Sequence, residues 1–176
     1  MAPSIVRLQS EAFNIADELS ALRMACRTNP ESEGEKNSGI GALLSFTGLV
    51  RDLDHGTPLK SLYLEHYPAM TERQIKAIAF GAITRFSLAG CTIIHRHGRL
   101  VPDDEIVLVI TAARHRKAAF AAADFIMDWL KIKAPFWKKE DLGQEQHWVA
   151  QKDSDLDAAR SWEAPVHQLN KPRSEQ

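Results

Sequence analysis

Hydrophobic residues recur every three or four positions in three long segments of the chain. This period matches the turn of an α-helix and gives each segment one apolar face. The three predicted helices are residues 12–27, 68–86 and 115–133. Gly81 weakens the second helix, and we expect Pro135 to end the third, because proline cannot continue a helix.

The remaining hydrophobic residues form shorter runs that are typical of β-strands. Leu62, Leu64 and His66 alternate with Ser61, Tyr63 and Glu65. A two-residue period places successive side chains on opposite faces of a strand. The predicted strands are residues 40–50, 59–67, 91–100, 105–113 and 147–151. A short helix is predicted at residues 154–162.

These strands come in neighbouring pairs, with helices between the pairs. That order favours an α+β fold with a mostly antiparallel sheet over a doubly wound parallel sheet. The length of 176 residues fits a single domain, which buries about 70% of the surface of its unfolded chain. We expect an N-terminal helix and polar loop (1–40), a core that carries the chemistry (41–162) and a flexible tail (163–176).

Charge and composition argue against several classes of function. The formal net charge is −1 and the sequence pI is near 6.7, so bulk binding to nucleic acid or to an anionic membrane is not expected. No eighteen apolar residues run together, which predicts a cytoplasmic protein without a membrane span. Cys26 and Cys91 have no CxxC spacing, and we interpret both as buried thiols.

The stretch KIKAPFWKKE, residues 131–140, gathers four lysines and two aromatic residues directly after the third helix. We expect Phe136 and Trp137 to lie in a loop and to pack onto the protein body, which would hold the lysines in place. A lysine near other cations has a lowered pKa and can transfer protons, while a second one binds an anion. Alternatively, Lys131 caps the helix through the dipole and the other lysines are solvated. Glu140 could orient a lysine or offset its charge.

Two further basic sites stand at the ends of predicted strands. His115 and Arg116 follow the strand 105–113 where the third helix begins, and a helix start disfavours cations but attracts anions. Arg51 follows the strand 40–50 beside Gly48; glycine permits close backbone approach, and arginine suits phosphate. Solvent-facing charges at turns remain the alternative for both sites.

Other catalytic and metal-binding patterns are missing from the sequence. It contains no GxGxxG, GxxxxGK[ST], GxSxG or HExxH pattern. His95 and His97 could share a strand face, but a zinc site needs three or four ligands and the sequence supplies no others. We therefore expect no metal.

Several separated stretches together resemble the large, catalytic subunit of molybdopterin synthase. They are FTGLVRD, LEHYPAMTE, IIHRHGRL, the HR of RHRKAAF, and DWLKIKAPFWKKE followed by HWV. The resemblance runs from about Gly41 to Trp162 and is more specific than any one motif. It implies an α/β-hammerhead-like fold and a sulfurtransferase of molybdenum cofactor biosynthesis.

In that family, cyclic pyranopterin monophosphate receives two sulfurs and becomes molybdopterin. The resemblance implies that the sulfur arrives as the C-terminal glycine thiocarboxylate of a small ubiquitin-like subunit. It also implies a homodimer of large subunits within a heterotetramer, and no cofactor. The two cysteines then need no catalytic role.

The resemblance also assigns roles to particular residues. Lys131 and Lys138 match the catalytic lysines, and Arg160 matches a position that reaches the neighbouring subunit. The residues implied to bind substrate are Leu49, Val50, Arg51, His115, Arg116, Lys138, Lys139 and Glu140.

Three other functions compete with this interpretation. A non-catalytic module that binds the tail of a ubiquitin-like protein would need the cationic groove but not Lys131. An unrelated phosphate-binding enzyme is disfavoured because no phosphate-loop or nucleophile motif is present. Binding of single-stranded nucleic acid is disfavoured because only one short segment combines lysines with aromatics.

Overall fold

The computed structural model describes residues 1–27, 39–54, 57–143, 146–149 and 161–163. Its larger sheet has four strands, of which β6, β8 and β2 pair antiparallel while β1 runs parallel to β6. In spatial order the strands are β1 (Ser4–Gln9), β6 (Gly90–Arg96), β8 (Glu105–Ala113) and β2 (Ala42–Leu49).

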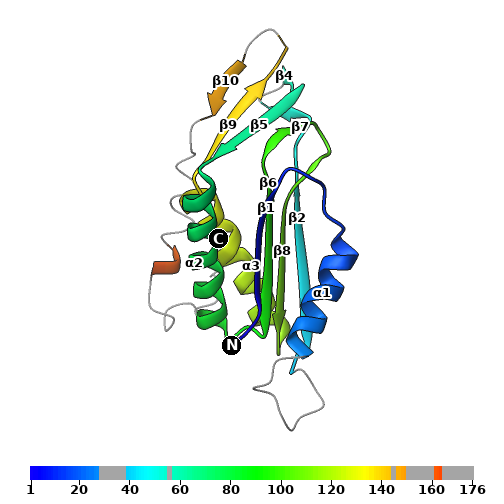
Figure 1. Cartoon of the computed structure of the whole chain (residues 1–176), viewed down its shortest axis with the longest axis vertical. Helices are drawn as coiled ribbons and strands as arrows, with labels where there is room; N and C mark the ends of the chain where they lie inside the picture. The colour runs from blue at the N-terminus through cyan, green and yellow to red at the C-terminus, as the bar shows by residue number, and fades with distance from the viewer. Residues whose placement is uncertain (28–38, 55–56, 144–145, 150–160, 164–176) are drawn as a thin grey trace, which may run out of the picture.

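A second sheet of four antiparallel strands lies beyond one end of the first (Figure 1). Its strands, in spatial order, are β10 (Gln146–Val149), β9 (Phe136–Asp141), β5 (Ser61–His66) and β7 (Gly98–Leu100). A two-stranded ribbon of β3 (Leu53–Asp54) and β4 (Thr57–Pro58) connects β2 to β5. Leu62, Leu64 and Leu100 form a small apolar cluster of this sheet with Val50 and Leu59.

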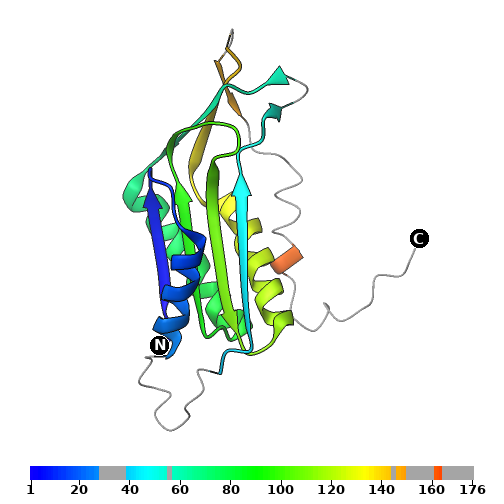
Figure 2. The ribbon, with the colours of Figure 1, turned by 90° about the vertical axis from the view of Figure 1, so that its right-hand side faces the viewer.

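Three α-helices sandwich the larger sheet (Figures 1 and 2). α2 (Pro68–Phe86) and α3 (Arg116–Lys133) pack together on one face, and α1 (Ile15–Arg27) covers the other. Strand alternation explains both cores: Val107 and Val109 of β8 point to α2 and α3, whereas Leu108 and Ile110 point to α1. All four side chains are buried.

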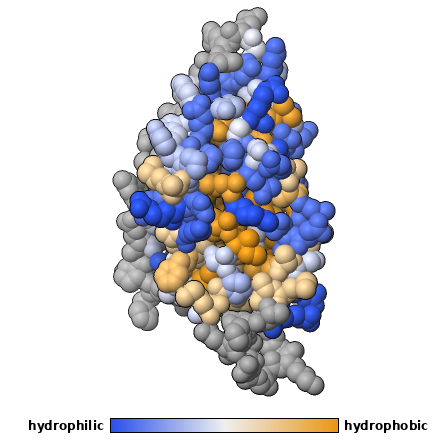
Figure 3. Space-filling view, in the orientation of Figure 1, coloured by the Kyte–Doolittle hydropathy of each residue, from blue (hydrophilic) through white to orange (hydrophobic). Residues whose placement is uncertain are grey.

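Hydropathy differs between the two sheets on the face seen in Figure 1. Figure 3 shows hydrophobic residues gathered across the middle of the molecule, while the region of the second sheet is mostly hydrophilic. No helix in the described part of the chain is long and apolar enough to cross a membrane.

Most predicted elements are confirmed. The α+β class, the mostly antiparallel pairing, the three helices and the end of α3 before Pro135 agree with the structure. Gly81 does not interrupt α2. The predicted polar loop lies almost wholly outside the described residues, as does the predicted helix 154–162 apart from a 3-10 turn, η2 (Ser161–Glu163).

Two predictions of local structure were wrong and one strand was missed. The single strand predicted at residues 91–100 is two strands of different sheets, β6 and β7, because the chain leaves the larger sheet after Arg96 and turns at Gly98, whose φ is 81°. Phe136 and Trp137 lie on strand β9, not in a loop, because the chain after Pro135 pairs with β5 on one side and β10 on the other. Residues 4–9, to which no element was assigned, form β1. β9 and β1 each pair with a strand from a distant part of the sequence, β9 with β5 and β1 with β6.

Candidate active site

A cavity of about 530 Å³ lies where the two sheets meet the last turns of α3. The groups on its wall come from the end of β2, from α3 and from β9, with contributions from β5, β6 and β8. The charged and titratable side chains on it are Arg51, His95, Lys131, Lys138 and Glu140. Three cations face one carboxylate, so the cavity favours an anionic ligand.

Helical spacing places Lys131 on this wall. Met127, Leu130, Lys131 and Ala134 all line the cavity, and positions i, i+3, i+4 and i+7 share one face of a helix. The Ala134 N–H donates to the Leu130 carbonyl at 3.3 Å and closes the last turn. Lys131 is a solvent-exposed residue and lines the cavity.

Strand alternation places Lys138 on the opposite wall. Phe136, Lys138 and Glu140 point into the cavity, whereas Trp137 and Lys139 occupy the intervening positions of β9 and face away. Lys138 is exposed, but Glu140 is only 9% exposed. The Glu140 carboxylate therefore offsets part of the positive charge of the three cations from a fixed, buried position on the cavity wall.

The end of β2 supplies the third part of the wall. Its pairing with β8 shifts register between Gly48 and Leu49, which is a β-bulge. A Cβ at Gly48 would lie 2.8 Å from Val107 Cγ1, so the close approach expected for this glycine is present. Beyond the bulge, Val50 is buried while Leu49 and Arg51 are exposed, and all three line the cavity.

His95 forms a neutral part of the wall that the sequence analysis considered only as a metal ligand. Its ring stacks on Phe136 at 4.0 Å between centroids. Its Nδ1 lies 2.8 Å from the Arg96 carbonyl oxygen, which can only accept, so Nδ1 carries the proton. Burial, followed by the charge of Lys138, lowers the pKa of His95 to about 4. The sequence signal that could have found it is a histidine directly after Ile93 and Ile94 in an apolar strand.

The structure does not bring every predicted site residue to this cavity. His115 is the N-cap of α3 and Arg116 its first residue, so fifteen residues of helix, about 22 Å, separate Arg116 from Lys131. Lys139 faces away on β9 and lies 5.9 Å from the Trp148 ring. Arg160 lies outside the described residues.

Metal binding finds no support in the described part of the chain. No group of three or more His, Cys, Asp and Glu side chains there could hold an ion. His66 and His97 approach to 4.4 Å between ring centroids, and burial followed by the charge of His97 lowers the pKa of His66.

Comparisons with known proteins agree on one family. The family model described as MoaE protein matches residues 11–133. A molybdopterin synthase catalytic subunit from Mesorhizobium japonicum is 45% identical over 166 residues, which are 93% of this chain and 96% of the relative. One from Pseudomonas aeruginosa is 44% identical over 158 residues, 90% of this chain and 98% of the relative.

A solved structure supports the same assignment. The molybdopterin biosynthesis MoaE protein from Burkholderia ambifaria superposes with a TM-score of 0.73 at 41% identity, covering 94% of this chain and all of that one. The chain therefore belongs to the MoaE family, whose curated relatives are catalytic subunits of molybdopterin synthase.

Proposed function

We propose that the cavity is the place where cyclic pyranopterin monophosphate is converted to molybdopterin. The observation that carries this proposal is the convergence of Arg51, Lys131 and Lys138 on one cavity from three separate elements. Fixed cations bind a phosphate group and stabilise negative charge that develops during reaction. Membership in the family of molybdopterin synthase catalytic subunits supports the same function.

The sulfur comes from a partner in this proposal: the C-terminal thiocarboxylate of a small ubiquitin-like subunit. The chain's own cysteines support an external source. Cys26 and Cys91 are buried and neither lines the cavity. Burial raises the pKa of both thiols to about 11, and a thiol that remains protonated is a poor nucleophile.

Each charged residue of the cavity has its own role in this proposal, which follows from its position on the wall. Arg51 offers a planar fork of donors for the phosphate, and Lys138 neutralises developing negative charge from the opposite wall. The thiocarboxylate sulfur forms a bond to the pterin, and water then breaks its bond to the acyl group, which releases the tail as a carboxylate. Lys131 transfers a proton in these steps or contacts that acyl group. Leu49, Val50 and Glu140 complete the wall for the substrate.

His115 and Arg116 act, in this proposal, on the cavity of a second copy of the chain. Their separation from Lys131 along α3 is too long for both ends of the helix to contact one small substrate. A homodimer within a heterotetramer would bring the start of α3 from one copy to the cavity of the other. We propose the same role for Arg160.

The first test is turnover of cyclic pyranopterin monophosphate with the thiocarboxylated small subunit, for wild type and for Lys131→Ala. We expect the variant to lose at least about 100-fold in kcat. Its unfolding midpoint should remain close to wild type, since Lys131 is exposed. Equal turnover by the two proteins would remove Lys131 from the mechanism. Binding of the small subunit without turnover by either protein would favour a non-catalytic tail-binding module.

The second test is complementation between two inactive variants. Lys131→Ala and Arg116→Ala, coexpressed with different tags, yield mixed dimers in which one of the two cavities has both residues intact. Such dimers should recover about half of wild-type turnover. Mixed dimers as inactive as their parents would show that Arg116 serves the cavity of its own chain.

A further inference from the structure

The backbone that carries Arg51 is fixed by a turn between β7 and β8. The Val50 N–H donates to the Asp104 carbonyl at 2.9 Å, and the Asp103 N–H donates to the Val50 carbonyl at 2.9 Å. Val50 is therefore held on both sides by the turn. Arg51, the residue that follows these two hydrogen bonds, lines the cavity.

The turn is itself closed by two internal hydrogen bonds. The Val101 N–H donates to Asp104 Oδ2 at 2.8 Å, and the Asp104 N–H donates to the Val101 carbonyl at 3.0 Å. Asp103 has a φ of 70°, in the left-handed region that non-glycine residues seldom adopt. Aspartate is one of the few non-glycine residues that tolerate this conformation, and it does so in turns such as this one.

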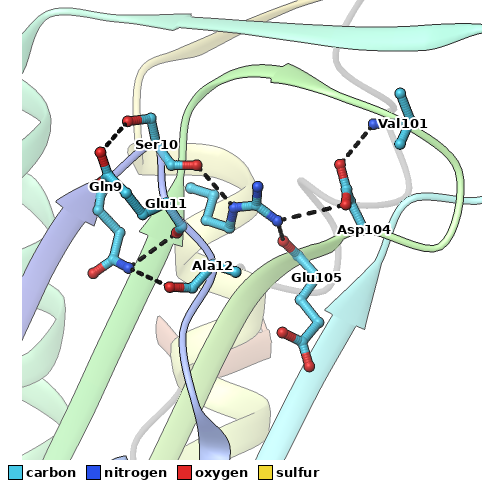
Figure 4. A network of polar contacts seen from close by, with 8 residues as sticks. Gln9, Ser10, Glu11, Ala12, Val101, Asp104 and Glu105 are labelled. Carbon is cyan, nitrogen blue, oxygen red and sulfur yellow. Dashed lines mark hydrogen bonds and ion pairs between the residues drawn. The ribbon is translucent and has the colours of Figure 1, made fainter.

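Arg96 anchors the turn from behind the cavity wall. Its Nε donates to the Ser10 carbonyl at 3.1 Å and its Nη1 to the Glu105 carbonyl at 2.9 Å, while Nη1 lies 3.8 Å from Asp104 Oδ1 (Figure 4). Only 9% of Arg96 is exposed. A planar guanidinium with several donors fixes these carbonyls relative to one another.

The anchored carbonyl belongs to the residue opposite the bulge. Leu49 pairs with Glu105 where the register of β2 shifts. Arg96 therefore holds the β8 side of the bulge through Glu105, and Asp104 holds the chain that follows it through Val50. An exposed arginine has many rotamers, so its backbone must be fixed if it is to meet a phosphate in one geometry.

We propose that Arg96 and Asp104 are positioning residues that hold Arg51 in place for the phosphate group of the pterin substrate. Neither side chain lines the cavity, so both act through Arg51 and not on the substrate directly. The inference rests on the proposed function, in which Arg51 binds that phosphate.

A double-mutant cycle on substrate binding tests this coupling. The affinity of full-length protein for cyclic pyranopterin monophosphate is measured by calorimetry for wild type, Arg96→Gln, Arg51→Ala and the double variant. We expect Arg96→Gln to weaken binding about tenfold when Arg51 is present and less than about twofold in the Arg51→Ala background. KM should rise more than kcat falls in turnover with the thiocarboxylated small subunit.

The possible outcomes separate the inference from the proposed function. If Arg51→Ala leaves affinity unchanged, Arg51 does not bind the phosphate; the inference is then wrong, together with the role of Arg51 in the proposed function, while turnover by wild type and Lys131→Ala still tests the function itself. If Arg51→Ala weakens binding but Arg96→Gln has the same effect in both backgrounds, only the positioning role is overturned. A merely structural role for Arg96 predicts this second outcome.

Two further variants distinguish weaker substrate binding from a general loss of folding. Asp104→Asn keeps an oxygen that can accept from the Val101 N–H but removes the charge facing Arg96. We expect this variant to bind the substrate about threefold more weakly than wild type, again only with Arg51 present.

Arg85→Gln is the matched control for Arg96→Gln. Arg85 also donates to a backbone carbonyl, that of Trp162 at 2.8 Å, and does not line the cavity. It should lower the unfolding midpoint without changing affinity. Equal weakening by Arg85→Gln and Arg96→Gln would overturn the positioning role.

Discussion

The two faces of β9 differ more than their sequence suggests. Lys138 and Lys139 are adjacent and chemically identical, yet Lys138 lines the cavity and Lys139 faces the opposite side, near Trp148. The aromatic pair divides in the same way: Phe136 stacks on His95, whereas Trp137 meets the Tyr67 ring edge-on at 5.0 Å. Like residues that cluster in the sequence can therefore lie on opposite faces of one strand, one face at the cavity and the other away from it.

The largest expected difference between the two faces is in catalysis. Lys138→Ala should reduce turnover of the pterin substrate by about 100-fold or more, because it removes a cation from the cavity. Lys139→Ala is the matched control and should reduce turnover less than about threefold. The measurement is kcat with the thiocarboxylated small subunit. Comparable losses in the two variants would show that the faces are not functionally distinct.

A smaller difference is expected in stability. Phe136→Ala should lower the free energy of unfolding by about 2 kcal/mol, because the ring is partly buried against His95 and the main core. Trp137→Ala should cost less than about 1 kcal/mol, since Trp137 is 43% exposed. Chemical denaturation of both variants measures the contrast. A larger cost at Trp137 would mean that the outer face packs more tightly than its exposure indicates.

The last expected difference concerns the response of the cavity face to acid. With its pKa lowered to about 4, His95 stays neutral in the folded chain at pH values where an unfolded histidine, with a pKa near 6.5, takes up a proton. Stability is therefore lost as the pH falls from about 6.5 to about 4, by about 3 kcal/mol for this group.

His95→Gln isolates that contribution, because the remaining titratable groups are shared with wild type. Denaturation at pH 7 and pH 4.5 should show a smaller acid loss in the variant than in the wild type. Identical losses would mean that His95 protonates equally in the folded and unfolded chains.

The sequence predicted the elements that local periodicity determines. α2 and α3 each place one apolar face on a sheet, so their 3.6-residue pattern was sufficient. β9 was missed because FWKKED has no alternation of apolar and polar residues and follows a proline. Its strand conformation depends on pairing with β5, which lies about seventy residues earlier in the chain and which a local pattern cannot show.

The candidate site was only partly predictable for the same reason. Arg51, Lys131 and Lys138 were identified from sequence, but their convergence depends on β9 crossing beside the end of α3. His115 and Arg116 were grouped with them, whereas the rigid length of α3 places them at its other end. His95 entered the site through its stacking on Phe136, a contact between residues 41 positions apart in a chain whose β9 was not predicted.

The position of β1 has a consequence for biosynthesis. It is the first strand to leave the ribosome, yet its pairing partners, from Cys91 to Arg96, are translated more than eighty residues later. β2 must likewise wait for β8, so β1–β6 is the first pair of the larger sheet that can form during translation, and the pairs β6–β8 and β2–β8 follow once β8 is made. The cavity wall, which needs β9, is assembled only after the sheet that supports it.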